Sequence, residues 1–68
     1  MGVEIPENLT PRVVARIRNR SLGHLANERH RGVGPVYIKD GGRVYYPADK
    51  LREYLDLRMI DPSRKNGE

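Results

Sequence analysis

The sequence contains no cysteine, tryptophan or phenylalanine, and four tyrosines are its only large aromatic residues. Without cysteine there is no disulfide and no thiolate metal site, so packing alone has to stabilise the core. No apolar run approaches the ~20 residues that span a membrane, and no signal-peptide pattern opens the chain. These absences favour a cytoplasmic protein with no membrane partner. At 68 residues the chain has room for one small domain and not for a deep enzyme pocket.

Acidic residues are scarce where basic residues gather. The chain has 13 Lys and Arg against 9 Asp and Glu, which gives a net charge of +4. Residues 11–31 hold six arginines and one acidic residue, Glu28. Such a run often does no more than keep a surface hydrated. It is also what a protein needs to bind an anionic polymer, and that is the sharper hypothesis.

Two helices are predicted in the basic stretch. Thr10 is a capping residue and Pro11 suits a first helical position, so a helix is expected to begin there. Its buried face is predicted to hold Val13, Val14 and Ile17. A turn at Arg18-Asn19-Arg20 precedes a second helix. Ser21 caps its start, and the segment from Gly32 to Pro35 ends it. Its buried face is predicted to hold Leu22, Leu25 and Ala26.

Two short strands, residues 36–39 and 43–46, surround Asp40-Gly41-Gly42 and predict a hairpin. A two-residue loop would place Ile38 opposite Tyr45 and would divide the apolar residues between the two faces. A three-residue loop places Ile38 opposite Val44 and gathers them, so we expect the second register. It predicts a core face of Val36, Ile38, Val44 and Tyr46, and an outer face of Tyr37, Lys39, Arg43 and Tyr45.

A third helix is expected to begin at Pro47 and to end before Pro62. Its predicted apolar stripe is Ala48, Leu51, Tyr54 and Leu55. Three apolar residues near the end of this helix exceed what one small core needs: Leu57, Met59 and Ile60. They are candidates for contact between copies of the chain, as are Val3 and Ile5 near the N-terminus. The expected organisation is an N-terminal arm over residues 1–8, one domain over 9–60 and a flexible tail over 61–68.

The order helix, three-residue turn, helix, Gly-Pro break, hairpin and helix predicts an α+β fold, mostly helical, of the winged helix-turn-helix type. A helix of such a fold fits the major groove of DNA, and a basic hairpin can contact the neighbouring phosphates or minor groove. No metal site, cofactor or catalytic group is expected, because His24 and His30 are six residues apart and no cysteine supports them.

The sequence resembles the MerR-like winged-helix family of small phage excisionases, also called recombination directionality factors. The matching residues are Leu9-Thr10-Pro11, Ala15, Ser21, Leu25, Gly34-Pro35-Val36-Tyr37-Ile38-Lys39, Gly41-Gly42-Arg43-Val44, Tyr46-Pro47, Asp49-Lys50-Leu51 and Tyr54-Leu55. The resemblance implies a DNA-binding protein without enzymatic activity. It would bind attachment-site DNA in several copies, bend it, and steer an integrase toward prophage excision.

Three residues depart from the family pattern. Arg18 stands where an apolar residue commonly ends the first helix, and Glu28 stands where an aromatic residue is usual in the second. These two leave the packing of the helices open. Tyr45 stands where a basic residue is usual in the predicted hairpin of residues 36–46, which is the wing of this fold type. Its hydroxyl can still donate a hydrogen bond to phosphate.

The candidate DNA-binding residues fall into three groups. Arginines of the first two helices and their turn supply charge: Arg16, Arg18, Arg20 and Arg31. Polar side chains of the second helix supply contacts in the major groove: Ser21, His24 and Asn27. The wing contributes Lys39, Arg43 and Tyr45.

Two other functions remain open at this stage. A transcription regulator would use the same contacts on a promoter. A protein-interaction module would present the arginine-rich face to an acidic partner. An RNA-binding role is disfavoured, because the tyrosines fall mostly at core positions and make no stacking platform.

Overall fold

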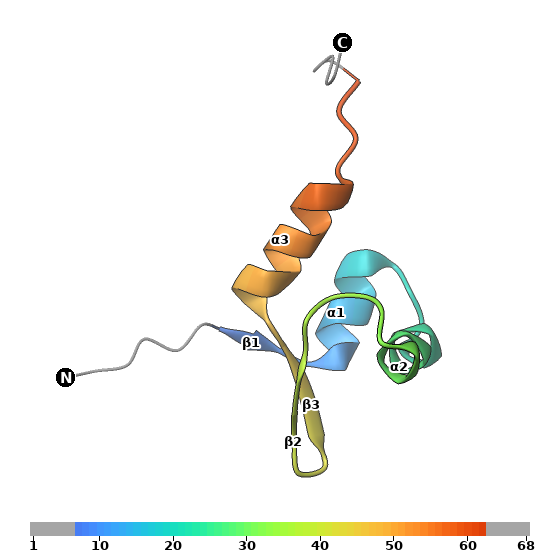
Figure 1. The fold of residues 1–68 in the computed structure, drawn as a ribbon, viewed down its shortest axis with the longest axis vertical. Helices are drawn as coiled ribbons and strands as arrows, with labels where there is room; N and C mark the ends of the chain where they lie inside the picture. The colour runs from blue at the N-terminus through green and yellow to red at the C-terminus, as the bar shows by residue number, and fades with distance from the viewer. Residues whose placement is uncertain (1–6, 63–68) are drawn as a thin grey trace, which may run out of the picture.

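The computed structural model describes residues 7–62, which fold into three helices and a three-stranded antiparallel sheet (Figure 1). In chain order the elements are β1 (Asn8–Leu9), α1 (Pro11–Arg18), α2 (Leu22–Arg31), β2 (Ile38–Asp40), β3 (Arg43–Pro47) and α3 (Ala48–Arg58). The predicted α+β class is confirmed, and the order is consistent with a helix-turn-helix followed by a hairpin. Most of the predicted arm and tail, with Val3 and Ile5, lies outside the described residues.

The predicted ends of α1 and α2 are confirmed by their caps. The hydroxyl of Thr10 accepts a hydrogen bond from the backbone N–H three residues later, at 3.2 Å. Ser21 caps α2 in the same way, at 3.0 Å. Both helices end at a residue in the left-handed conformation, Asn19 with φ 56° and Gly32 with φ 74°. These local signals fix the two helices and the short turn between them.

The core is small and centres on three fully buried side chains, Val14, Leu25 and Tyr46, with Ala15 and Leu51 beside them. The predicted buried faces of α1 and α2 are therefore partly wrong. Four residues predicted to be buried are exposed: Val13, Ile17, Leu22 and Ala26. Helices this short bury only a narrow stripe, and tertiary packing decided its position.

The hairpin adopts the register that the sequence argument rejected. Ile38 pairs with Tyr45, Lys39 with Val44, and Asp40 with Arg43 across a two-residue Gly41-Gly42 loop. Gly41 supplies the positive φ, 63°, that such a tight turn requires. The geometry of the two-residue turn therefore determined the register, and not the burial of the apolar residues on one face.

This register redistributes the side chains of the hairpin. Val44 and Tyr37 pack against the core, so the prediction that Tyr37 is exposed is wrong. Ile38 is 39% exposed and Val36 is exposed as well, so the prediction that they are buried is also wrong. Cross-strand partners share a face, so Ile38 and Tyr45 form the outer, partly apolar face of the wing.

The sequence argument missed the third strand. β1 pairs with β3, with Asn8 opposite Pro47 and Leu9 opposite Tyr46. The backbone N–H of Ala48 donates to the carbonyl of Glu7 at 2.7 Å. Asn8, which was predicted to lie in the arm, therefore belongs to the sheet, and Glu7 is bonded to the first residue of α3. A two-residue strand has too short an alternation to be recognised in a sequence.

The third helix follows the predicted stripe. Leu51 is buried, and Tyr54 and Leu55 are half-buried, as expected. α3 begins directly after Pro47 and ends at Arg58, before Pro62. Leu57, Met59 and Ile60 are exposed, as their surplus predicted.

Candidate nucleic-acid interface

The first candidate surface is built on α1, α2 and the turn that joins them. The turn is held by a backbone bond from the N–H of Arg20 to the carbonyl of Ala15 at 2.9 Å. Arg16 and Arg20 are both exposed there. Arg12, which the predicted site did not include, is exposed on the same helix. The prediction of a basic surface at this turn therefore has solvent-facing side chains to support it.

Arg18 is different from its neighbours because it faces the interior. Its guanidinium donates to both carboxylate oxygens of Glu28, at 2.7 and 3.0 Å, and lies over the ring of Tyr54. The two charged side chains are only 9% and 12% exposed. Hydrogen bonding to Arg18 holds the pKa of the Glu28 carboxyl below its ordinary value, and the same bonds raise the pKa of Arg18. We therefore leave Arg18 out of the candidate interface.

The pair also answers the question that Arg18 and Glu28 left open about the packing of the helices. Arg18 of α1 and Glu28 of α2 bind each other. The contact between α1 and α2 therefore includes a nearly buried ion pair at these two positions.

The outward face of α2 is the second candidate surface. Asn27 is exposed, and His30 and Gly23 share its face by their spacing of three and four residues. His24 lies at the edge of that face, and its Nε2 is 3.2 Å from the Glu28 carboxylate. The sequence argument omitted His30 from the site, although the helical spacing already placed it beside Asn27.

Ser21 and Arg31 lie at the two ends of α2. Ser21 is exposed, and its hydroxyl is engaged as the N-cap. Arg31 is exposed in the last turn. Arg29 instead points to the sheet, where its guanidinium donates to the hydroxyl of Tyr46 at 2.7 Å. Arg29 thus joins α2 to the core.

The wing is the third candidate surface, and its tip projects clear of the helices in Figure 1. Lys39 and Arg43 are exposed, and Tyr45 is half-buried. The register places Lys39 on the face of Val44 and Arg43 on the opposite face. The prediction that Lys39 and Arg43 share a face is therefore wrong.

Within residues 7–62, most basic side chains of these surfaces belong to no ion pair within 4.0 Å. Among residues 7–62, the ion pairs within 4.0 Å are Arg18–Glu28, His24–Glu28 and Lys50–Glu53. Five predicted site residues are exposed cations with no acidic partner in that range: Arg16, Arg20, Arg31, Lys39 and Arg43. An anionic ligand would meet them without first breaking an ion pair.

Other kinds of site were sought in the described part of the chain. Within residues 7–62 no group of three or more His, Cys, Asp or Glu side chains is placed to hold a metal ion. In the same range no helix has the length and apolar character to cross a membrane.

Comparisons of the chain with models of protein families, with curated proteins and with solved structures find no match.

Proposed function

We propose that this protein is a winged helix-turn-helix protein that binds double-stranded DNA in a sequence-specific way and acts as an excisionase-like architectural factor. It binds attachment-site DNA in several copies, bends it, and directs an integrase toward prophage excision. The supporting observation is the set of exposed cations on α1, in the turn after it, on α2 and on the wing that have no acidic partner within 4.0 Å among residues 7–62. The family resemblance supplies the role in excision.

The physical argument rests on how DNA is bound. Unpaired arginine and lysine side chains displace counterions from phosphates, which supplies affinity without sequence preference. Asn27 on the exposed face of α2 can pair with the N6 and N7 edge of adenine, which supplies specificity. The contacts that helix and wing gain together offset a bending cost of ~1–6 kcal/mol.

A salt series in gel-shift or anisotropy measurements tests DNA binding itself. If ~4–6 phosphates are neutralised, log affinity falls against log salt with a slope of about −4 to −5. Arg43→Ala should weaken binding to specific and random DNA by similar factors. Asn27→Ala should lower affinity for the true site by ~1–3 kcal/mol and affect random DNA much less. Lys50→Ala, an exposed change on α3 away from these surfaces, is the matched control and should leave binding unchanged.

Recombination assays in both directions test the role. With its cognate integrase, the protein should promote excision between hybrid attachment sites and be dispensable for integration. If the protein changes the rate of neither excision nor integration but alters transcription from a nearby promoter, the role in excision would be replaced by transcription regulation. Binding with no salt dependence would remove DNA as the partner altogether.

A further inference from the structure

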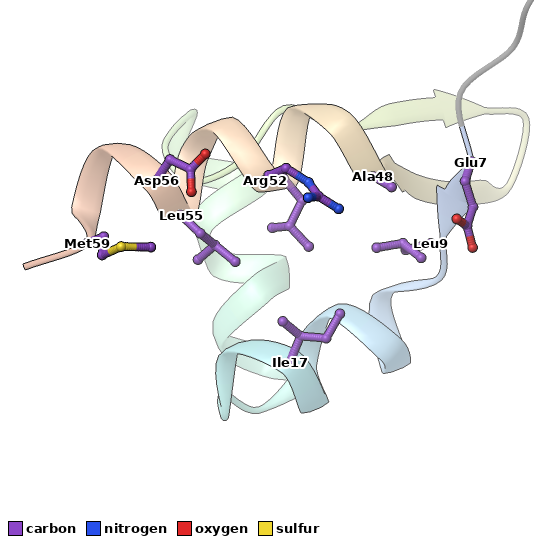
Figure 2. Close-up of a pocket in the computed structure, with 9 residues that line it drawn as sticks. Glu7, Leu9, Ile17, Ala48, Arg52, Leu55, Asp56 and Met59 are labelled. Atoms are coloured by element: carbon purple, nitrogen blue, oxygen red, sulfur yellow. The ribbon is translucent and has the colours of Figure 1, made fainter.

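An open apolar groove of about 440 Å³ runs between α1 and α3 on a part of the molecule that the proposed DNA contacts do not use. Its apolar lining comes from β1, α1, α3 and the C-cap residue of α3: Leu9, Ile17, Ala48, Leu51, Leu55 and Met59. Figure 2 shows Ile17 rising from α1 toward α3, with Met59 at one end and Leu9 with Ala48 at the other. Ile17 and Met59 are exposed, so the groove leaves apolar surface in contact with water. An uncovered surface of this kind commonly marks an interaction site.

We propose that a second copy of this chain occupies the groove, with the two α3 helices antiparallel across a two-fold axis beside Leu55. In this arrangement Leu55 of each copy meets its counterpart. Met59 of each copy lies opposite Leu51 of the other groove. The inference is independent of DNA binding.

The positions along α3 support this pairing. Leu51 and Met59 are equally distant from Leu55, so a two-fold axis at Leu55 brings the exposed Met59 of one copy opposite the Leu51 end of the other.

Charge complementarity at the rim also selects a second copy. Arg52 and Asp56 line the groove one turn apart on α3, and both are exposed. Within residues 7–62 neither belongs to an ion pair within 4.0 Å. An antiparallel copy presents its Asp56 toward Arg52 and its Arg52 toward Asp56. With the axis at Leu55, Arg52 of one copy and Asp56 of the other are offset by two residues, ~3 Å along the helix axes, which an arginine side chain can span. A partner with a rim of one sign would satisfy only one of them.

The first test is the mass of the full chain in the absence of DNA. Sedimentation equilibrium over a concentration series should show the mass rising from 7.8 kDa toward twice that value. Met59→Glu should weaken association at least about tenfold, because it places a charge in the apolar contact. Leu57→Glu is the matched control, since Leu57 is 83% exposed, lies two residues away and does not line the groove, and it should have no effect.

A charge exchange tests the antiparallel register. Arg52→Asp and Asp56→Arg should each weaken association, about tenfold, because each acts twice in a two-fold pair and replaces attraction by repulsion. The double variant should restore association. Circular dichroism checks that each variant is folded.

Three results overturn the proposal. A chain that stays monomeric up to about 1 mM would show that a second copy does not occupy the groove. Equal effects of Met59→Glu and Leu57→Glu would place the contact elsewhere. A double charge exchange that does not restore association would exclude this register. None of these results depends on DNA, so they are separable from a failure of the proposed function.

Discussion

Removing Glu28 alone should destabilise the protein severely, whereas removing Glu28 and Arg18 together should not. The two side chains are almost buried and bind each other through two hydrogen bonds. Taking away one partner of such a pair leaves the other as a buried, uncompensated charge, with a typical loss of ~3–5 kcal/mol. Replacing both partners by apolar side chains of similar volume is often neutral or stabilising.

The magnitude is large for so small a domain. At ~0.05–0.15 kcal/mol per residue, the free energy of unfolding of this chain is about 3–10 kcal/mol. Glu28→Met is therefore expected to remove about 3 kcal/mol and to leave a substantial unfolded population. The double variant, Arg18→Met with Glu28→Met, should stay within about 1 kcal/mol of the parent. A methionine at position 18 can pack against the ring of Tyr54, over which the Arg18 guanidinium lies in the parent protein.

Urea denaturation followed by circular dichroism measures all four proteins of the cycle. A coupling free energy of about 2 kcal/mol or more between the two positions is expected. Small and additive losses, each below about 1 kcal/mol, would refute the reasoning, because they would show that water still solvates the pair.

The pH dependence gives a second, independent readout of the same pair. Hydrogen bonding to Arg18 lowers the pKa of folded Glu28 below its ordinary value of 4.5. A carboxyl with a depressed folded pKa contributes stability that is complete above the unfolded pKa and is lost as the pH falls through the folded value. The parent protein should therefore lose stability below about pH 4.5, and the double methionine variant should lose less over the same range.

Three further predictions concern single residues. Gly34→Ala should lower the unfolding free energy by more than the ~1–2 kcal/mol that a positive φ alone costs, because a Cβ there would lie 2.8 Å from Glu28 Oε1. Gly41→Ala would meet nothing within 4 Å and should lose only the ~1–2 kcal/mol of the positive φ. Urea titrations of the two variants compare these losses. Ile38→Ala should lose well under the ~2–5 kcal/mol of a core truncation, as its outer-face position requires, and a larger loss in thermal unfolding would restore the rejected register. Gly23→Ala should raise the unfolding free energy by ~1 kcal/mol, because its Cβ would meet only Ser21 Oγ at 3.9 Å, and a fall in thermal stability would contradict this.

Local signals in the sequence were sufficient for the helix ends. Thr10, Ser21 and Gly32 act through their own backbone or side-chain chemistry, so their roles do not depend on the rest of the fold. The hairpin was predicted correctly as an element, but its predicted register was wrong. The prediction gave more importance to burying the apolar residues on one face than to the preference of Gly41-Gly42 for a two-residue turn. The outer face of the hairpin is open to solvent, so the gain from gathering apolar residues was smaller than assumed.

Two further errors arose from contacts that are distant in sequence. β1 exists only because β3 lies beside it, which no pattern in residues 8–9 reveals. Arg18 was placed on the surface because arginine usually is, and its partner Glu28 is ten residues away on another helix. An excess of charge in the sequence identifies which stretch is basic. Pairing with Glu28, the single acidic residue of that stretch, determines which of its arginines is buried and so cannot contact a ligand.

The two proposals place a condition on each other. Pairing through α3 is isologous and therefore closes at two copies, whereas several copies side by side on DNA require a contact that repeats in one direction. The groove cannot supply both contacts at once. Outside the groove and the proposed DNA contacts, Leu57 and Ile60 are exposed apolar side chains. A paired protein that also fills DNA cooperatively would have to use a second surface of this kind, so Met59→Glu would reduce pairing in solution without abolishing cooperativity on DNA. If Met59→Glu removes both, one surface serves both associations and the two-fold arrangement is wrong.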